Sequence, residues 1–158
     1  MATMQEQKQR QLKLFNNIIY GFASGLYDLF GESALATMGN IGEGVLQDME
    51  NELGLEVDGE NAEDILTEIE RLLVDEYGLV DTIEFTKEGQ DVSLTCQGCL
   101  LWQATESLQK DNVPPYTCAP MMMASTALHK RLGVRRKFVS LDQEMDEHIC
   151  HVHFQLME

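Results

Sequence analysis

The hydrophobic pattern changes its period near the middle of the chain. Up to Tyr77, apolar residues recur at intervals of three and four, the spacing of one face of an α-helix. From Leu79 onward, apolar and polar residues alternate, which is typical of half-buried strands. This order predicts an α+β fold in which N-terminal helices pack on an antiparallel sheet.

The first half of the sequence predicts three helices, spanning Gln5 to Phe30, Ala34 to Leu53 and about Asn61 to Tyr77. Asn61 is the expected N-cap of the third helix, and Gly54 the expected C-cap of the second. Three further glycines lower the helix propensity of the second helix, so we expect close packing against a neighbouring helix to hold it. These glycines are Gly39, Gly42 and Gly44.

The second half predicts two pairs of strands separated by helical segments. A hairpin is expected first, then a short helix, then a helix opened by Cys118 and Pro120, then two closing strands. In the last strand, Cys150 shares its face with apolar residues and should point to the core, whereas His151 and His153 should face solvent. The predicted ranges are Leu79 to Thr86, Asp91 to Cys96, Leu100 to Lys110, Cys118 to Leu132, Val134 to Leu141 and His148 to Met157.

The net charge of −16 is concentrated in one region. Residues 41 to 91 hold 17 of the 27 acidic side chains and only two basic ones. This region would repel the phosphate backbone of a nucleic acid, so direct binding of DNA or RNA is not expected. The one basic run, residues 130 to 137, could form a local anion patch, but we prefer the interpretation that it flanks a helix end and a strand.

The chain, 158 residues long and 44% hydrophobic, fits one domain with a real core. It shows no signal peptide and no apolar stretch approaching the roughly 20 residues of a membrane span, so we expect no membrane contact and a cytoplasmic location. In that compartment its four cysteines should be thiols or metal ligands.

Cys96 and Cys99 form the motif C-Q-G-C, whose spacing lets two sulfurs approach one ion. Cys118 should lie at a helix start and Cys150 in a strand, so that four thiols could close a tetrahedral site. Two alternatives remain open: Cys118 and Cys150 as small buried hydrophobic residues, or thioredoxin-like redox chemistry at the C-x-x-C motif.

The stretch from Cys118 to Leu156 resembles the closing half of the 4-vinyl reductase domain family. The shared features are a cysteine that begins a helix, a helix ended by Gly133 that leads into a basic and apolar strand, and a late cysteine, Cys150. The resemblance extends over most of the chain, since the segment F-G-E-S-A-L at residues 30 to 35 also suits the family. It implies a single domain, residues 1 to 158, with the fold of ligand-binding domains in NO signalling and Golgi transport, including TRAPP subunits.

The resemblance also implies a metal site of one acidic ligand and three cysteines. Here the position eight before Cys150 is Asp142 instead of cysteine, and Cys96 and Cys99 occupy the region of the family's acidic ligand. The expected zinc ligands are therefore the four cysteines, with His148 or Asp142 as substitutes. An Fe–S cluster is the alternative, because four cysteines serve that chemistry too.

The family binds small hydrocarbons, which implies a pocket between helices and sheet. We assign Phe22, Tyr27, Trp102 and Met122 to its walls, although core packing would equally explain the methionine. No nucleophile, phosphate-binding or dinucleotide motif is present, so no catalytic residue is assigned.

These features predict a domain that binds or senses a small apolar or aromatic ligand, carries a structural metal and acts as a homodimer. The first alternative is an Fe–S-dependent reductase acting on a tetrapyrrole vinyl group, as the family name suggests. The second is an acidic scaffold that captures a basic protein through residues 41 to 91.

Overall fold

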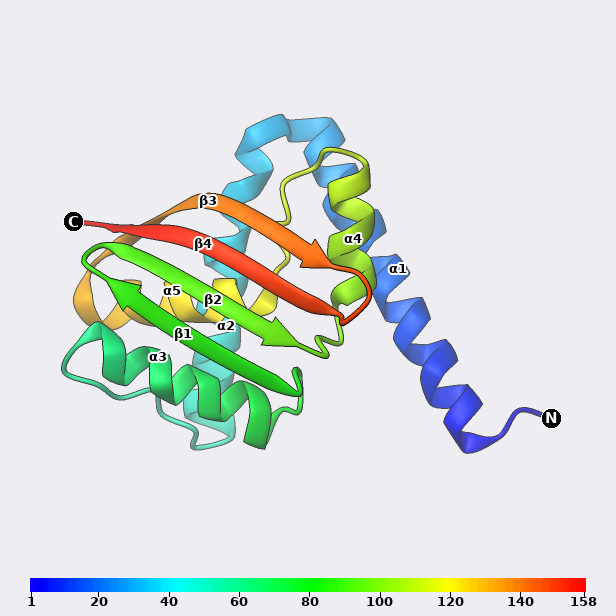
Figure 1. Cartoon of the computed structure of the whole chain (residues 1–158), viewed down its shortest axis with the longest axis horizontal. Coiled ribbons are helices and arrows are strands. Elements are labelled where there is room, and N and C mark those ends of the chain that lie inside the picture. Colours follow the sequence, from blue (N-terminus) through cyan, green and yellow to red (C-terminus); the bar gives the residue numbers. More distant parts are fainter.

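One antiparallel sheet forms the centre of the molecule. In the computed structural model, which describes residues 1–158, its strands lie in the order β1-β2-β4-β3, so that the two hairpins join through β2 and β4. The helices gather behind this sheet (Figure 1). The α+β class with N-terminal helices and an antiparallel sheet is confirmed. The strands are β1 (Thr82–Glu88), β2 (Asp91–Gln97), β3 (Arg135–Glu144) and β4 (Ile149–Met157).

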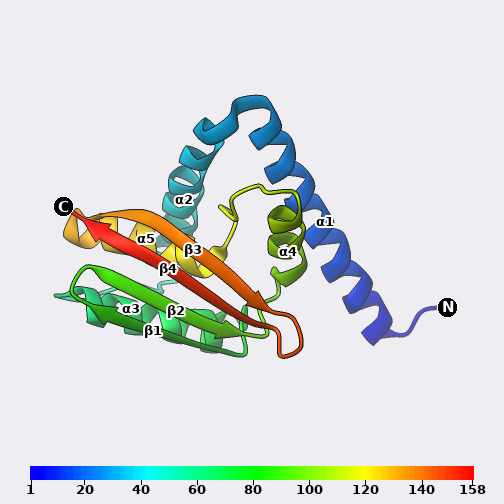
Figure 2. The ribbon, with the colours of Figure 1, turned by 45° about the horizontal axis from the view of Figure 1, so that its top comes forward.

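The five α-helices lie close to the predicted positions. Helices α1 and α2 meet at a sharp bend, which Figure 2 shows as an inverted V, and a 3₁₀ segment at Gly31–Ala36 joins them. Helix α3 begins after Asn61, whose side chain accepts a hydrogen bond from Asp64 N at 2.9 Å, so the predicted N-cap is confirmed. The helices are α1 (Met4–Phe30), α2 (Thr37–Glu52), α3 (Ala62–Arg71), α4 (Trp102–Lys110) and α5 (Ala119–Leu132).

Helix α5 runs through the core between α2, α3 and the sheet. Its three consecutive methionines, Met121, Met122 and Met123, point in different directions along the helix, as expected, yet all three are buried. A helix covered on several sides buries every face, which explains this. Its C-terminal cap is Gly133, in the left-handed conformation that the sequence predicts.

The close helix approach expected from the glycines of α2 occurs at one of them. A Cβ atom on Gly42 would lie 2.1 Å from Thr126 Oγ1 and 3.2 Å from Met122 Cγ of α5. Gly39 and Gly44 have nothing within 4 Å of that position. Only Gly42 is therefore required by packing, because it lets α2 lie directly against α5.

The first helix differs most from the other elements. Its apolar stripe is exposed, with Phe22 at 71% and Leu29 at 77%, whereas its buried residues are Asn16 and Ala23. Helix α1 contacts α4 and the 3₁₀ segment, and its N-terminal half projects away from the sheet (Figure 1). The side facing the domain therefore combines Asn16 and Ala23 with the partly buried Tyr20, Leu26 and Tyr27, and most of the apolar stripe is left open.

Three strands, β1, β2 and β3, end beyond their predicted positions, and β1 begins at Thr82 instead of Leu79. Strand β1 continues to Glu88 because a two-residue turn, with Gly89 at φ 63°, is enough to close the hairpin. Strand β3 continues to Glu144 and contains a β-bulge between Phe138 and Ser140, where its register against β4 shifts. The bulge turns Leu141 and Gln143 inward, on the side that Arg136 and Phe138 occupy before it.

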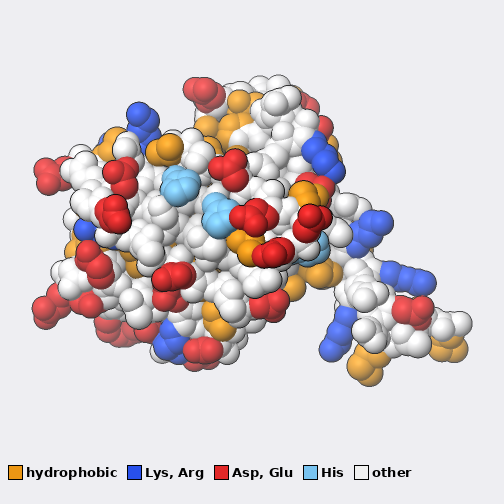
Figure 3. Space-filling model, viewed as in Figure 1, with side chains coloured by type: hydrophobic (Ala, Val, Ile, Leu, Met, Phe, Trp, Pro, Cys, Tyr) orange, Lys and Arg blue, Asp and Glu red, His pale blue; other side chains and the backbone are white.

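The outer face of the sheet is polar. His151 and His153 lie there, as predicted, and bond across the strand to Thr95 and Ser93 of β2. Figure 3 shows acidic side chains spread over the same side of the molecule.

None of the helices combines the length and the apolar character that crossing a membrane would require.

Candidate functional site

All four cysteines line one small cavity. Cys96 and Cys150 are direct cross-strand partners on β2 and β4, Cys118 precedes α5, and Cys99 follows β2 in the connecting loop. The cavity has a volume of about 10 Å³, which is close to the space for a single water molecule. The sequence elements that carry the thiols therefore converge as predicted, although they are up to 54 positions apart in the chain.

The loop of the C-Q-G-C motif depends on its glycine. Gly98 has φ +70°, in the left-handed region, and its N–H donates to the carbonyl of His148 at 3.3 Å. A Cβ atom there would lie 2.0 Å from a carboxylate oxygen of Asp81. The glycine thus permits the tight turn that returns Cys99 to the cavity of Cys96.

The thiols influence one another strongly. Burial raises the pKa of Cys99 to about 11 and that of Cys118 to about 12. The hydrogen bond between the thiols of Cys96 and Cys150 raises the pKa of Cys150 and lowers that of Cys96. Negative charge on Cys118, Cys96 or Cys99 would raise the pKa of Cys150 further, so the group cannot hold several thiolates without a compensating cation.

The four cysteines are gathered around the cavity as thiols. All four cysteines are free, and no three Cys, His, Asp or Glu side chains lie in positions that would hold a metal ion. The four sulfurs are nevertheless the type of ligand that zinc and iron bind, and no carboxylate lines the cavity beside them. The other lining residues are Leu101, Trp102, Thr105, Pro120 and Gln143.

The two proposed substitutes for a cysteine ligand lie elsewhere. His148 is exposed in the turn before β4, and its ring stacks on Trp102 with 5.0 Å between ring centroids. Asp142 is exposed on β3, opposite His151 on the outer face of the sheet. Neither side chain lines the cysteine cavity.

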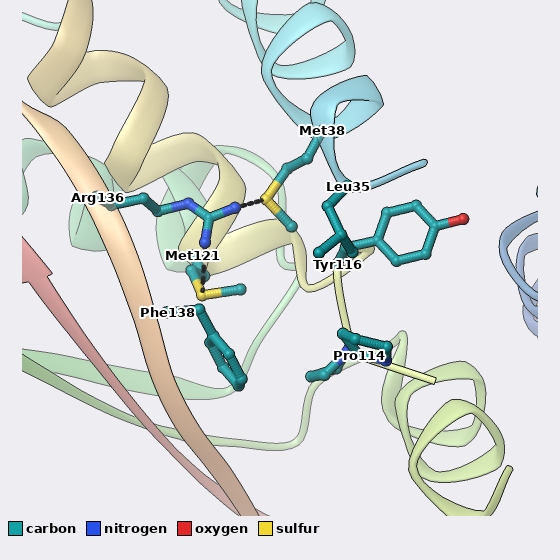
Figure 4. Close-up of a pocket in the computed structure, with 8 residues that line it drawn as sticks. Leu35, Met38, Pro114, Tyr116, Met121, Arg136 and Phe138 are labelled. Atoms are coloured by element: carbon teal, nitrogen blue, oxygen red, sulfur yellow. Dashed lines mark hydrogen bonds between the residues drawn. The ribbon is translucent and has the colours of Figure 1, made fainter. Parts of the chain in front are cut away.

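A second cavity lies beside the first turn of α5, between this helix, β3 and the 3₁₀ segment. It is larger, with a volume of about 280 Å³. Met121 of α5, Phe138 of β3 and Tyr116 of the preceding loop form its walls, and the guanidinium of Arg136 reaches into the same group (Figure 4). Tyr116 is held in place because its hydroxyl donates to the carbonyl of Ala23 at 2.6 Å. The remaining lining residues are Leu35, Met38, Pro114 and Pro115.

The four residues assigned to the pocket from sequence are not among these. Phe22 lies on the open side of α1, Tyr27 packs at the edge of the core, Met122 faces Gly42, and Trp102 lines the cysteine cavity. Periodicity alone does not tell which side of a helix meets the pocket, and α1 turns Phe22 away from the domain while Tyr27 packs against the core. The structure therefore does not bring these four together.

Arg136 was included in the basic run and assigned no specific role. A usable signal exists in the sequence, because Arg136 and Phe138 have the same parity in a predicted strand and must share a face. An arginine that shares the inward face of a strand with a phenylalanine is a charged group in an apolar environment, which indicates a functional role.

These features define an α+β fold that ligand-sensing domains also adopt. The structure superposes on the phenol-responsive sensory domain of the transcription activator PoxR with phenol, with a TM-score of 0.55 and 13% identity, covering 89% of this chain and 74% of that chain. It also superposes on a Cs H-NOX mutant with a TM-score of 0.50 and 5% identity, covering 84% and 68%.

By its sequence the chain belongs to the family described as "putative rubredoxin C-terminal domain", which matches residues 15–156. The predicted fold of ligand-binding sensory domains is thereby confirmed, whereas membership of the 4-vinyl reductase family is not, because the family model that matches is a different one. Comparison with curated protein sequences gives no match.

Proposed function

We propose that this protein binds a small, mainly apolar or aromatic molecule in the pocket between α5, β3 and the 3₁₀ segment, and so acts as a sensing or carrying domain. The observation that carries the proposal is the pocket of about 280 Å³, whose walls are mostly apolar and come from four separate segments. The shared fold with a sensory domain that was solved with phenol supports it.

A metal bound by Cys96, Cys99, Cys118 and Cys150 is the second part of the proposal. Four thiols around a cavity of about 10 Å³ are the donor set of a closed structural zinc site, and iron is the alternative for the same ligands. Such a metal would tie β2, β4 and the start of α5 together. It would also compensate the charge that the four thiols cannot carry alone.

The two sites share one helix. Cys118 and Met121 are three positions apart, so the residue that would bind metal and the residue that forms the pocket wall lie within one turn of α5. Burial raises the pKa of Cys118, and the positive charge of Arg136 opposes a small part of that rise. Fixing the start of α5 with a metal would therefore also fix the pocket.

Self-association through α1 is the third part. Phe15, Ile18, Phe22 and Leu29 follow heptad spacing and are 44% to 77% exposed. The N-terminal part of the same helix carries Lys8, Arg10 and Lys13, while Asp28 lies at its other end. A second copy of this chain, with its α1 antiparallel, would cover the stripe and pair these opposite charges.

A cytoplasmic location is the fourth part of the proposal. Four free thiols suit a reducing compartment such as the cytoplasm.

The test combines metal analysis with ligand binding on the purified full chain. Elemental analysis and native mass spectrometry should give about one zinc per chain in a colourless protein. A brown protein that contains iron and absorbs visible light would replace zinc by the Fe–S alternative and reopen the reductase hypothesis. A folded protein without stoichiometric metal would overturn the metal site, and failure of every neutral and acidic aromatic probe to bind would overturn the pocket.

A further inference from the structure

The pocket contains one charged group that has no charged partner. The guanidinium of Arg136 donates to two thioether sulfurs, from Nη1 to Met121 Sδ at 3.7 Å and from Nη2 to Met38 Sδ. No carboxylate lies within ion-pair distance of it. A thioether is a weak acceptor, so these contacts leave the cation poorly compensated (Figure 4).

A shortage of carboxylates does not explain this arrangement. The chain has 27 acidic residues and 11 basic ones, and the neighbouring Lys130 and Arg131 both pair with Glu50. The other basic residues without an ion pair are exposed on the surface, whereas Arg136 is half-buried beside Phe138. Arg136 is thus the inward-facing basic residue that the chain leaves without a counter-ion.

Keeping this cation in the pocket is unfavourable in the absence of an anion. Burial lowers the pKa of Arg136, which reflects the loss of its hydration, yet a guanidinium stays protonated in proteins. A half-buried charge that has lost part of its hydration is destabilising unless a partner neutralises it. The partner would have to enter from outside, because the walls of the pocket hold no acidic side chain.

We propose that the ligand of this pocket is an organic carboxylate with a small apolar or aromatic body. Its ring or chain would pack against Leu35, Tyr116 and Phe138, and its carboxylate would replace the two sulfurs as the partner of Arg136. A carboxylate can accept two parallel hydrogen bonds from a guanidinium, which gives orientation as well as affinity. This inference rests on the proposed ligand-binding function and specifies its ligand class.

The size of the pocket agrees with such a ligand. About 280 Å³ is at the lower end of the range for small-molecule sites, which suits one or two aromatic rings and not a large cofactor. The polar atoms are concentrated at Arg136, so the charged end of the ligand would lie against β3 and its apolar end against the loop of Pro114 and Tyr116.

One acidic side chain needs a control. Glu43 of α2 is exposed and lines an adjacent hollow that also includes Arg136 and Met38, although it makes no ion pair with Arg136. A Glu43→Gln variant removes this charge without changing the pocket of Leu35, Tyr116 and Phe138. If Glu43 were the natural partner of Arg136, its removal would strengthen binding of an added carboxylate.

The test compares matched acids and alcohols by isothermal titration calorimetry on the full chain. The pairs are benzoate and benzyl alcohol, 1-naphthoate and 1-naphthalenemethanol, and octanoate and octanol. In at least one pair the carboxylate should bind about tenfold more tightly than the alcohol, with an affinity that falls as salt is raised. Arg136→Met should remove this preference by weakening binding of the carboxylate more than binding of the alcohol, and Glu43→Gln should change the preference by less than about threefold.

Each outcome separates this inference from the function on which it rests. Binding of alcohols with equal or weaker binding of carboxylates would overturn the carboxylate ligand and leave the apolar pocket in place. A carboxylate preference that persists in Arg136→Met would overturn the role of Arg136. Absence of binding by all six probes would contradict both proposals. If Arg136→Met fails to fold, as judged by circular dichroism, Arg136→Gln and the wild-type comparison of acids with alcohols still decide the question.

Discussion

Cys96 and Cys150 lie directly opposite each other on β2 and β4, and each thiol shifts the pKa of the other, lowering that of Cys96 and raising that of Cys150. These strands link the two hairpins of the sheet, so the pair is located at the join between the two halves of the β-structure. Cys118 meets them from the start of α5 and Cys99 from the loop after β2. A metal at this point would connect the sheet to the helix that carries one wall of the ligand pocket.

Replacing Cys118 or Cys150 by serine should release the metal and lower the stability of the protein. We expect a loss of about 4 kcal/mol or more in the free energy of unfolding, since removing a bound metal is among the few single changes with effects of that size. Metal content per chain and thermal unfolding should be measured together on each variant.

The matched control is Leu46→Ala, a buried position in α2 away from the cysteines. This change should cost about 2–5 kcal/mol by leaving a cavity while keeping the metal content of the folded protein unchanged. Full metal content in both cysteine variants would contradict a site shared by Cys118 and Cys150.

Gly42→Ala should destabilise the protein by about 1–3 kcal/mol, because the new methyl group would overlap Thr126 of α5. Gly44→Ala is the control in the same helix, with open space around its Cβ position. That change should stabilise the protein by about 0.5–1 kcal/mol through higher helix propensity. Chemical denaturation measures both values, and effects of equal sign would contradict the close contact of α2 with α5.

Asn16→Ala should weaken the attachment of α1 to the domain. Asn16 donates to the carbonyl of Leu100 at 2.8 Å and accepts from Ala104 N at 3.0 Å, so its loss leaves the buried N–H of Ala104 unpaired and removes the link to Leu100. The expected cost is about 1–3 kcal/mol, with faster hydrogen exchange in α1 and at the start of α4. The neighbouring exposed change Asn17→Ala should alter neither, and similar exchange in the two variants would argue against this anchor.

Glu50→Gln should lower stability at neutral pH but not in acid. Burial alone would raise the pKa of Glu50, yet the hydrogen bond from Lys130 and the charges of Arg131 and Lys130 outweigh it and hold this pKa below its usual value. A lowered pKa in the folded state means that the stabilisation is complete above the ordinary glutamate pKa and is lost as the pH falls through the folded value.

The difference between wild type and Glu50→Gln should therefore be about 1 kcal/mol at pH 7 and disappear in acid, once the pH lies below the lowered pKa of Glu50. Urea denaturation across this pH range measures it, and high salt should reduce it. A difference that does not depend on pH would show that the carboxylate charge of Glu50 is not the cause.

Phe22→Glu should convert a dimer into a monomer, because a charge in the middle of the apolar stripe of α1 opposes its pairing with a second copy. Light scattering after gel filtration should give twice the chain mass for wild type and the single mass for the variant. Gln9→Glu, on the opposite side of α1, should remain dimeric. A wild-type protein that stays monomeric at high concentration would mean that the stripe is not covered by a second copy.

Much of the local structure can be read from the sequence. The change from helical to alternating periodicity predicts the order of helices and strands, and Asn61, Pro120 and Gly133 predict where helices begin and end. These features depend on residues close together in the chain, through hydrogen bonds and backbone conformations that each segment sets for itself. The inward direction of Cys150 follows in the same way from alternation along one strand.

Contacts between segments that are distant in the chain could be determined only from the tertiary structure. Alternation alone would place Ser140 on the same face as Arg136 and Phe138. The bulge in β3 shifts the register of this strand against β4 by one residue, so Leu141 points inward instead. Likewise the apolar stripe of α1 is visible in the sequence, yet only the packing of Asn16 against α4 decides that the opposite side meets the domain.

The sequence by itself determined that four thiols lie in elements able to approach one another, and it determined the class of fold. Only the tertiary structure decided that the pocket contains Arg136 and lies apart from Phe22, Tyr27, Trp102 and Met122. The physical reason is that periodicity specifies which residues share a face of one element, whereas a cavity is defined by which faces of different elements meet. That choice depends on long-range packing, which no local pattern in the chain encodes.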